Sequence, residues 1–174
     1  MTSYVRNNAP NNWTAVFLKD SKIISTLYTN ISMVEGYCES SGEVVPLAVA
    51  NIIKVAAMVR VTDTYGPIPY SAIGFEGAVK TPYDSQEDIY NKFFEELKAA
   101  RQVLLDNPTA VMSPLVDKVY AGDISKWLRF ANSLQLRLAL RISYANPTLA
   151  KQMAEDAINP ANGGVIETND QNAN

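Results

Sequence analysis

Residues 64–84 carry side chains that are well suited to binding a flat, polar ligand. The sequence there, TYGPIPYSAIGFEGAVKTPYD, has no apolar periodicity, and its glycines and prolines stiffen the backbone. The rings of Tyr65 and Tyr70 could stack on the C–H faces of sugars at a low cost in ordering. Trp13 offers a third ring, beside asparagines that could hydrogen-bond to hydroxyls. We therefore predict Trp13, Tyr65 and Tyr70 as ligand-binding residues, although the tyrosine rings could instead pack the loop onto neighbouring helices.

Catalytic chemistry finds little support in the sequence. There is no histidine, which excludes Ser-His-Asp and Cys-His sites and removes the commonest metal ligand. Glu87 and Asp88 lie close together, but at a predicted helix N-terminus, where acidic residues are expected for electrostatic reasons. Asp117 and Asp123 lack the ligand pattern of a calcium-binding loop and are expected to cap and close a turn. Cys38 is the single cysteine and is expected to be a small buried hydrophobe. We predict a protein that is not an enzyme and has no metal site.

Arg137 and Arg141 lie one helical turn apart. Two guanidinium groups at this spacing could grip a carboxylate or a phosphate. They could equally pair with acidic residues on a neighbouring helix or extend along the apolar surface. The structural role is the one that we expect.

Composition argues against two broad classes of protein. The 174 residues include 15 Lys and Arg against 18 Asp and Glu, a net charge of −3. This charge balance lacks the excess of basic residues that is typical of nucleic-acid-binding proteins. No uninterrupted apolar run approaches the ~18 residues that suggest a membrane-spanning helix.

The first residues, MTSYVRNNAP, lack the apolar core of a signal peptide, which fits either a cytosolic protein or a piece of a longer secreted one.

Apolar spacing predicts five helices, over residues 13–36, 44–63, 85–106, 124–144 and 147–158. Ser85, Asp123 and Asn146 are predicted as N-caps, and Gly36 as the stop of the first helix. The second helix is apolar on nearly every side and should lie at the centre of the fold. A short stretch at 164–167 is the segment that could instead be a strand.

The predicted fold class is all-α, an antiparallel helical array with long loops. The helices could form consecutive pairs in a tetratricopeptide-like layout, although the repeat consensus itself is not visible. Glu95, Glu96 and Arg101 lie mostly outside the apolar stripe of their helix, and the two glutamates are expected on a solvated face. If a part of the protein outside this chain normally covers helix 44–63, the helix is expected to leave an exposed apolar patch here. The chain is then expected to self-associate.

Four segments resemble the SusD/RagB family of Bacteroidetes outer-membrane lipoproteins, in particular its starch-binding, SusD-like group. They are VRVTDTYGPIPYS (59–71), YDSQEDIYNKFFEELKAARQVL (83–104), DKVYAGDISKWLRFANSLQLRLALRIS (117–143) and PTLAKQMAEDAI (147–158). The most specific block runs from Tyr120 to Arg141 and includes Trp127, Asn132 and Arg137. The resemblance covers residues 13–166.

The resemblance implies a tetratricopeptide-like scaffold at the cell surface that binds glycans or other nutrients. It also implies a SusC-like, TonB-dependent transporter as partner, no enzymatic activity and no organic cofactor. Members of the family are several hundred residues long, so residues 1–174 are interpreted as a single domain that forms a fragment of the helical repeat region, with its core at about 13–166.

Two alternatives remain open. The chain could be a helical interaction scaffold that docks to the transporter without a small-molecule site of its own. It could also be a carbohydrate-active enzyme, which would require turnover that depends on Glu87 or Asp88.

Overall fold

The computed structural model describes residues 16, 24–73 and 81–173. In this part of the chain, the elements are α2 (Ile24–Ser41), α3 (Val45–Tyr65), α4 (Gln86–Asp106), α5 (Ile124–Arg141), α6 (Pro147–Ile158) and the short 3-10 helices η2 (Pro160–Asn162) and η3 (Asn169–Gln171). Extended pairing among these residues amounts to two isolated bridges, Ile68 with Asp84 and Val111 with Asp123. The all-α prediction is confirmed.

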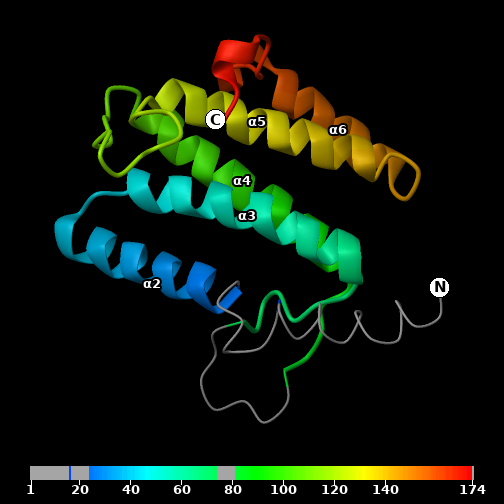
Figure 1. The fold of residues 1–174 in the computed structure, drawn as a ribbon. Coiled ribbons are helices and arrows are strands. Elements are labelled where there is room, and N and C mark those ends of the chain that lie inside the picture. The colour runs from blue at the N-terminus through cyan, green and yellow to red at the C-terminus, as the bar shows by residue number, and fades with distance from the viewer. Residues whose placement is uncertain (1–15, 17–23, 74–80, 174) are drawn as a thin grey trace.

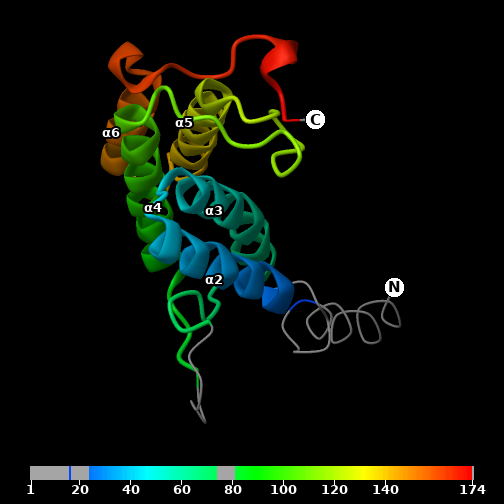
Figure 2. The same cartoon turned by 90° about the vertical axis from the view of Figure 1, so that its left-hand side faces the viewer.

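Consecutive helices pack against each other, from α2 on α3 to α5 on α6. Figure 1 shows them stacked in this order with alternating direction, and Figure 2 shows the stack turned by 90°. Because the direction alternates, the C-termini of α3 and α5 lie at the same end of the molecule as the N-termini of α4 and α6. The N-terminus of α3 and the C-termini of α2 and α4 lie at the opposite end.

Helix α3 is the central helix, as its composition predicts. Ile52, Val55 and Met58 are fully buried, and α3 contacts α2, α4 and α5. By length and hydropathy alone α3 could also cross a membrane. Its packing on three sides is that of a core helix, because apolar side chains around its circumference meet other helices.

The three predicted N-caps are confirmed. Ser85 Oγ accepts a hydrogen bond from the Asp88 backbone N–H at 3.1 Å, and Asn146 Oδ1 accepts one from the Leu149 N–H at 3.1 Å. Asp123 Oδ1 accepts the N–H of Ser125 at 2.9 Å. These side chains satisfy backbone donors that have no partner inside the helix, which fixes where α4, α5 and α6 begin.

Two predicted helix ends are wrong, and the possible strand is not formed. Helix α2 continues through Gly36 to Ser41, and the chain turns at Gly42. Gly42 has a φ of 77°, a left-handed conformation that glycine adopts without steric strain. Helix α5 ends at Arg141 rather than at residue 144, and residues 164–167 form no strand. The predicted start of the first helix lies outside the described residues.

A buried polar network holds α4, α5 and α6 together. Arg101 on α4 is 4% exposed, and its Nη2 lies 2.6 Å from Asp156 Oδ2 on α6. Its Nη1 donates to Asn132 Oδ1 and Gln135 Oε1 on α5, at 3.4 and 3.3 Å. Burial alone would raise the pKa of Asp156, but hydrogen bonds from Gln135 and Arg101 and the charge of Arg101 hold it below its ordinary value. Arg101 therefore lies inside the helix stack, although its place outside the apolar stripe suggested otherwise.

Candidate functional site

The structure buries one of the predicted ligand-binding rings. Tyr70 is 4% exposed, and its hydroxyl donates to Glu96 Oε2 at 2.6 Å. The Phe93 ring packs edge-on against it, with ring centroids 5.1 Å apart, and Lys54 Nζ lies 5.7 Å from the Tyr70 centroid. This corrects the expectation that Tyr70 stacks on a ligand, because a ring this enclosed cannot receive one. Tyr70 instead anchors its loop to α4.

Glu96 is half-buried, which corrects the expectation that it lies on a solvated face. It also pairs with Lys54, with Nζ and Oε1 3.0 Å apart, and its side chain is 27% exposed. Burial raises the pKa of Tyr70, and the nearby Glu96 carboxylate raises it further, so the phenol remains a proton donor to Glu96. Glu95, its neighbour, is exposed as predicted.

The other two predicted rings remain proposals. Tyr65 is the last residue of α3, is half-buried and packs against the core. Trp13 and its neighbouring asparagines lie outside the described residues.

Near Tyr70, the Asp84 carboxylate accepts hydrogen bonds from the backbone N–H and the hydroxyl of Ser71, at 2.6 and 2.7 Å, and so ties residues 71 and 84 of the loop together.

Asp117 closes the loop between α4 and α5, as its position predicts. Its carboxylate accepts the backbone N–H groups of Val119, Tyr120 and Gly122 at 2.9–3.1 Å, and the indole N–H of Trp127 at 2.8 Å. Burial alone would raise the pKa of Asp117, but these hydrogen bonds outweigh it and hold the pKa below its ordinary value. This aspartate is structural. In the described part of the chain, no group of three or more His, Cys, Asp or Glu side chains could hold a metal ion.

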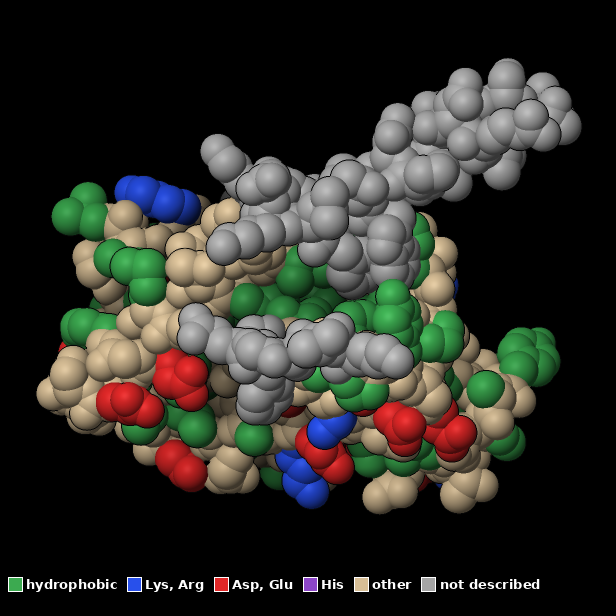
Figure 3. Space-filling model, turned by 90° about the horizontal axis from the view of Figure 1, so that it is seen from below, with side chains coloured by type: hydrophobic (Ala, Val, Ile, Leu, Met, Phe, Trp, Pro, Cys, Tyr) green, Lys and Arg blue, Asp and Glu red, His purple; other side chains and the backbone are tan. Residues whose placement is uncertain are grey.

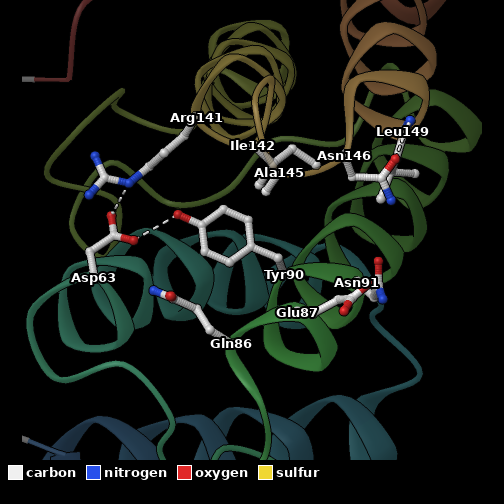
Figure 4. A pocket seen from close by; sticks show the side chains of 10 residues that line it. All are labelled: Asp63, Gln86, Glu87, Tyr90, Asn91, Arg141, Ile142, Ala145, Asn146 and Leu149. Carbon is white, nitrogen blue, oxygen red and sulfur yellow. Dashed lines mark hydrogen bonds and ion pairs between the residues drawn. The ribbon is translucent and has the colours of Figure 1, made fainter.

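A cavity of about 420 Å³ opens where α3 and α5 end and α4 and α6 begin. Figure 4 shows its lining, with Asp63 and Arg141 at one side and Glu87, Asn91 and Asn146 at the other. Its volume is within the range of small-molecule sites. This cavity, which we call the polar cavity, is the candidate site for a ligand.

Asp63 organises one side of the polar cavity. Its Oδ1 accepts a hydrogen bond from the Tyr90 hydroxyl at 2.7 Å, and its Oδ2 lies 2.9 Å from Arg141 Nε. The Asp63 side chain is 16% exposed, whereas that of Arg141 is 57% exposed. Burial raises the pKa of Tyr90, and its hydrogen bond to Asp63 raises it further, so the hydroxyl stays protonated. The guanidinium is held in place by a half-enclosed carboxylate while part of it reaches solvent.

The sequence identified some of these residues but not their proximity. Arg141 pairs with an acid on α3, which is one of the structural roles that the sequence predicted, whereas Arg137 is exposed and lines a different hollow on α5. Asp63, Gln86, Tyr90 and Asn91 were not predicted. The available signal was that these positions fall within two turns of helix ends that an antiparallel array brings together.

An apolar groove of about 840 Å³ lies at the opposite end of the same helices. Met33 and Tyr37 of α2 line it, together with Val111 and Val116 of the loop after α4. Val111 is 81% exposed and Val116 is 75% exposed. We call this hollow the apolar groove. Hydrophobic side chains also reach the surface at several places on the face seen from below in Figure 3.

Comparisons with known proteins identify the family. The family model described as "Susd and RagB outer membrane lipoprotein", named SusD-like, matches residues 2–174. The chain belongs to the SusD-like family. Among curated proteins, none matches it.

Solved structures of SusD homologues resemble this chain over most of its length. One from Bacteroides uniformis is 54% identical, with a TM-score of 0.87 over 94% of this chain and 33% of its own. A chitin-binding SusD homologue from Flavobacterium johnsoniae is 37% identical, with a TM-score of 0.74 over 86% of this chain and 32% of its own. A SusD-like protein from Bacteroides thetaiotaomicron is 34% identical, with a TM-score of 0.75 over 84% of this chain and 30% of its own. The chain thus spans about a third of the length of these relatives.

Proposed function

We propose that this chain is part of a nutrient-binding component of an outer-membrane uptake complex, and that its nutrient is an oligosaccharide or polysaccharide. The observation that carries this proposal is the similarity to the chitin-binding SusD homologue, at 37% identity over 86% of the chain. Membership of a family described as outer membrane lipoproteins supports the location. Under this proposal the protein is exposed at the cell surface and passes its ligand to a SusC-like, TonB-dependent transporter.

Binding without catalysis is also part of this proposal. Asp88 accepts a hydrogen bond from the Ser85 hydroxyl at 2.6 Å, within the cap of α4, and so has a structural task. Glu87 lines the polar cavity beside the amides of Asn91 and Asn146, and the second carboxylate of the lining, Asp63, is already engaged by the Tyr90 hydroxyl and by Arg141. A sugar bound nearby would meet hydrogen-bonding groups, and Asp63 would remain occupied by its pairing with Arg141.

Affinity electrophoresis tests the proposal directly. The chain is run through native gels with and without a soluble chitin derivative, a starch and a xylan, beside a protein that binds no glycan. Retardation by at least one polysaccharide is expected. Unchanged mobility in every gel, together with failure to sediment with insoluble chitin, would refute glycan binding by this chain.

A Tyr65→Ala variant, run in the same gels, tests whether the 64–84 loop contributes to binding. If Tyr65 stacks on the glycan, retardation falls while the far-ultraviolet circular dichroism stays unchanged. The same test applies to Trp13→Ala. Retardation equal to that of the unmodified chain would remove either ring from the site.

The apolar groove favours a second function, docking to the transporter as a helical scaffold. Exposed Val111 and Val116 form the kind of apolar surface that marks interaction sites with other proteins. A Val111→Lys variant distinguishes the two functions. Loss of transporter association with glycan retardation retained indicates that the groove docks and that glycan is bound elsewhere.

A further inference from the structure

The polar cavity combines a half-open hollow, fixed hydrogen-bonding groups and an apolar wall. Four helix ends contribute to it, so residues far apart in sequence, such as Asp63 and Asn146, lie around one hollow (Figure 4). The helices that carry them are held in place by the core packing of α3 and α4 and by the buried network between α4, α5 and α6. A site built on rigid elements loses little entropy when a ligand binds.

Two amide side chains of the cavity each use one of their polar atoms, the oxygen or the nitrogen, in a hydrogen bond within the fold. Asn146 Oδ1 accepts the Leu149 N–H at 3.1 Å, which directs its amide hydrogens away from the helix. Gln86 Nε2 donates to the Thr62 carbonyl at 3.0 Å, which leaves its Oε1 as an acceptor. The cavity therefore presents a fixed donor and a fixed acceptor, besides the Asn91 amide, which can serve as either.

The charges of the cavity are mixed. Asp63 is compensated by Arg141, with Nε and Oδ2 2.9 Å apart, and Glu87 adds a second carboxylate. An anionic ligand would meet two carboxylates against one guanidinium, and a cationic one would meet the exposed guanidinium. A hydroxyl group both donates and accepts, so a neutral ligand rich in hydroxyls fits all of these partners at once.

The wall formed by Ile142, Ala145 and Leu149 supplies the apolar contact that such a ligand also needs. Ile142 and Leu149 are half-buried and Ala145 is exposed, so their side chains are partly open to the cavity. The C–H face of a pyranose ring could lie against this wall while its hydroxyls reach the amides and the carboxylate. The volume of about 420 Å³ suits a short saccharide, being at the small end of ligand sites.

From these observations we infer that the polar cavity is a binding site for one or two neutral sugar rings, with Asn146 as a hydrogen-bond donor to the sugar. This inference rests on the proposed glycan-binding function and names a site for it. It does not involve Trp13, Tyr65 or Tyr70. Arg141, Asp63 and Tyr90 act as a preassembled set at one side of the cavity.

Calorimetric titration of the full chain with chitotriose and with maltotriose, against an Asn146→Asp variant, tests the inference. Aspartate keeps the side-chain oxygen that caps α6 but removes the two amide hydrogens. We expect the variant to weaken binding of whichever saccharide binds by roughly three- to tenfold, the size of one lost hydrogen bond. A second variant, Ala145→Phe, fills the cavity and is expected to abolish binding.

Asn159→Asp is the matched control. Asn159 Oδ1 accepts the Ala161 N–H at 3.0 Å as the cap of η2, at the other end of α6, so this change has the same chemistry and the same change of charge. It is expected to leave the affinity unchanged. Equal weakening by Asn146→Asp and Asn159→Asp would show a charge effect and overturn the inference.

The remaining outcomes separate this inference from the proposed function. If the chain binds a saccharide and neither Asn146→Asp nor Ala145→Phe changes the affinity, the polar cavity is not the site, while glycan binding stands. If acetate or inorganic phosphate binds more tightly than either saccharide and loses affinity in Ala145→Phe, the cavity takes anions and the inference is wrong. If no glycan binds to the chain in the titrations or in the affinity gels, both fail.

Discussion

The two ends of the helix stack carry opposite chemistry. At the end where α3 and α5 finish and α4 and α6 begin, the polar cavity is lined by charged and amide side chains around Asp63. At the other end, where α3 begins and α4 finishes, the apolar groove is lined by side chains such as Met33, Val111 and Val116. The same helices thus support a site suited to a small hydroxyl-rich molecule and a surface suited to a protein.

Part of the difference lies in the residues that begin the helices lining each hollow. Helix α4 is capped by Ser85 and has acidic residues in its first turn, and α6 is capped by Asn146, so polar groups gather where these N-termini meet. Helix α3 instead starts after Val44, which makes no side-chain capping hydrogen bond. Capping and first-turn residues of α4 and α6, such as Glu87 and Asn146, therefore supply part of the polar lining of the cavity.

Loss of Arg101 should affect both ends, because its network links α4 to α5 and α6 between them. We expect Arg101→Ala to lower the free energy of unfolding by about 3–5 kcal/mol, the usual result of removing one partner of a buried ion pair. Urea denaturation followed by circular dichroism measures this. Lys98→Ala, at an exposed position on the same helix, is the control and should change stability by less than ~0.5 kcal/mol. Similar effects of the two variants would show that the network adds no stability.

Gly122→Ala should disturb the apolar end alone. Gly122 has a φ of 90°, and a Cβ there would lie 2.0 Å from the Met112 carbonyl oxygen, which belongs to the lining of the groove. We expect a loss of about 2–3 kcal/mol from backbone strain and overpacking. Amide chemical shifts should change around residues 107–123 and stay constant around Asp63. Equal changes at both sites would mean that the two ends are not independent.

Acid should weaken the closure of the loop at the apolar end. The folded-state pKa of Asp117 is held below the ordinary aspartate value of 3.8, so its contribution to stability is present above that value. It is lost as the pH falls from about 4 towards the folded-state pKa, because protonation removes an acceptor of three backbone N–H groups and the Trp127 indole. Urea midpoints measured between pH 2 and 7 report this loss.

Asp117→Asn supplies the comparison for the acid titration. The variant should be less stable by about 2 kcal/mol at neutral pH, because an amide cannot accept all four donors. Its stability should also depend less on pH in the acid range. An unchanged acid profile would assign the acid sensitivity to other carboxylates.

Gly36→Ala is expected to stabilise α2 without affecting either end. The glycine lies inside the helix, and an added Cβ would meet no atom within 4 Å. Alanine should raise the free energy of unfolding by about 0.5–1 kcal/mol, by lowering the backbone entropy lost on folding. Thermal denaturation detects this gain. A destabilised variant would contradict the continuous helix through this position.

Val111→Lys should have almost no effect on stability but a clear one on association. The side chain is 81% exposed, so we expect a change within ~0.5 kcal/mol. If the groove mediates the self-association expected for this chain, light scattering at high concentration should show fewer oligomers in the variant. Equal oligomer content would assign association to another surface.

The sequence was most informative where structure is set locally. The caps Ser85, Asp123 and Asn146 act within three residues of themselves, and all three were predicted. Tyr70 and Arg101 were misjudged because their partners, Glu96 and Asp156, lie 26 and 55 residues away. Whether a tyrosine or an arginine is buried depends on such distant partners.

The polar cavity could not be predicted for the same reason. Arg141 was recognised as a residue that could hold an acid, but its pairing with Asp63 exists only after α3 and α5 are placed side by side. Gly36 was misread as a stop because glycine marks a helix end only where the backbone adopts a left-handed turn, and here Gly42 adopts it.

An NMR titration of the full chain with chitotriose and maltotriose would test the central claim most directly. If the chain binds glycan at its polar end, the largest amide shift changes should cluster on residues around Asp63, Glu87 and Asn146, while residues 107–116 of the apolar groove remain unchanged. Shift changes confined to the apolar groove, or none with either saccharide, would contradict the account.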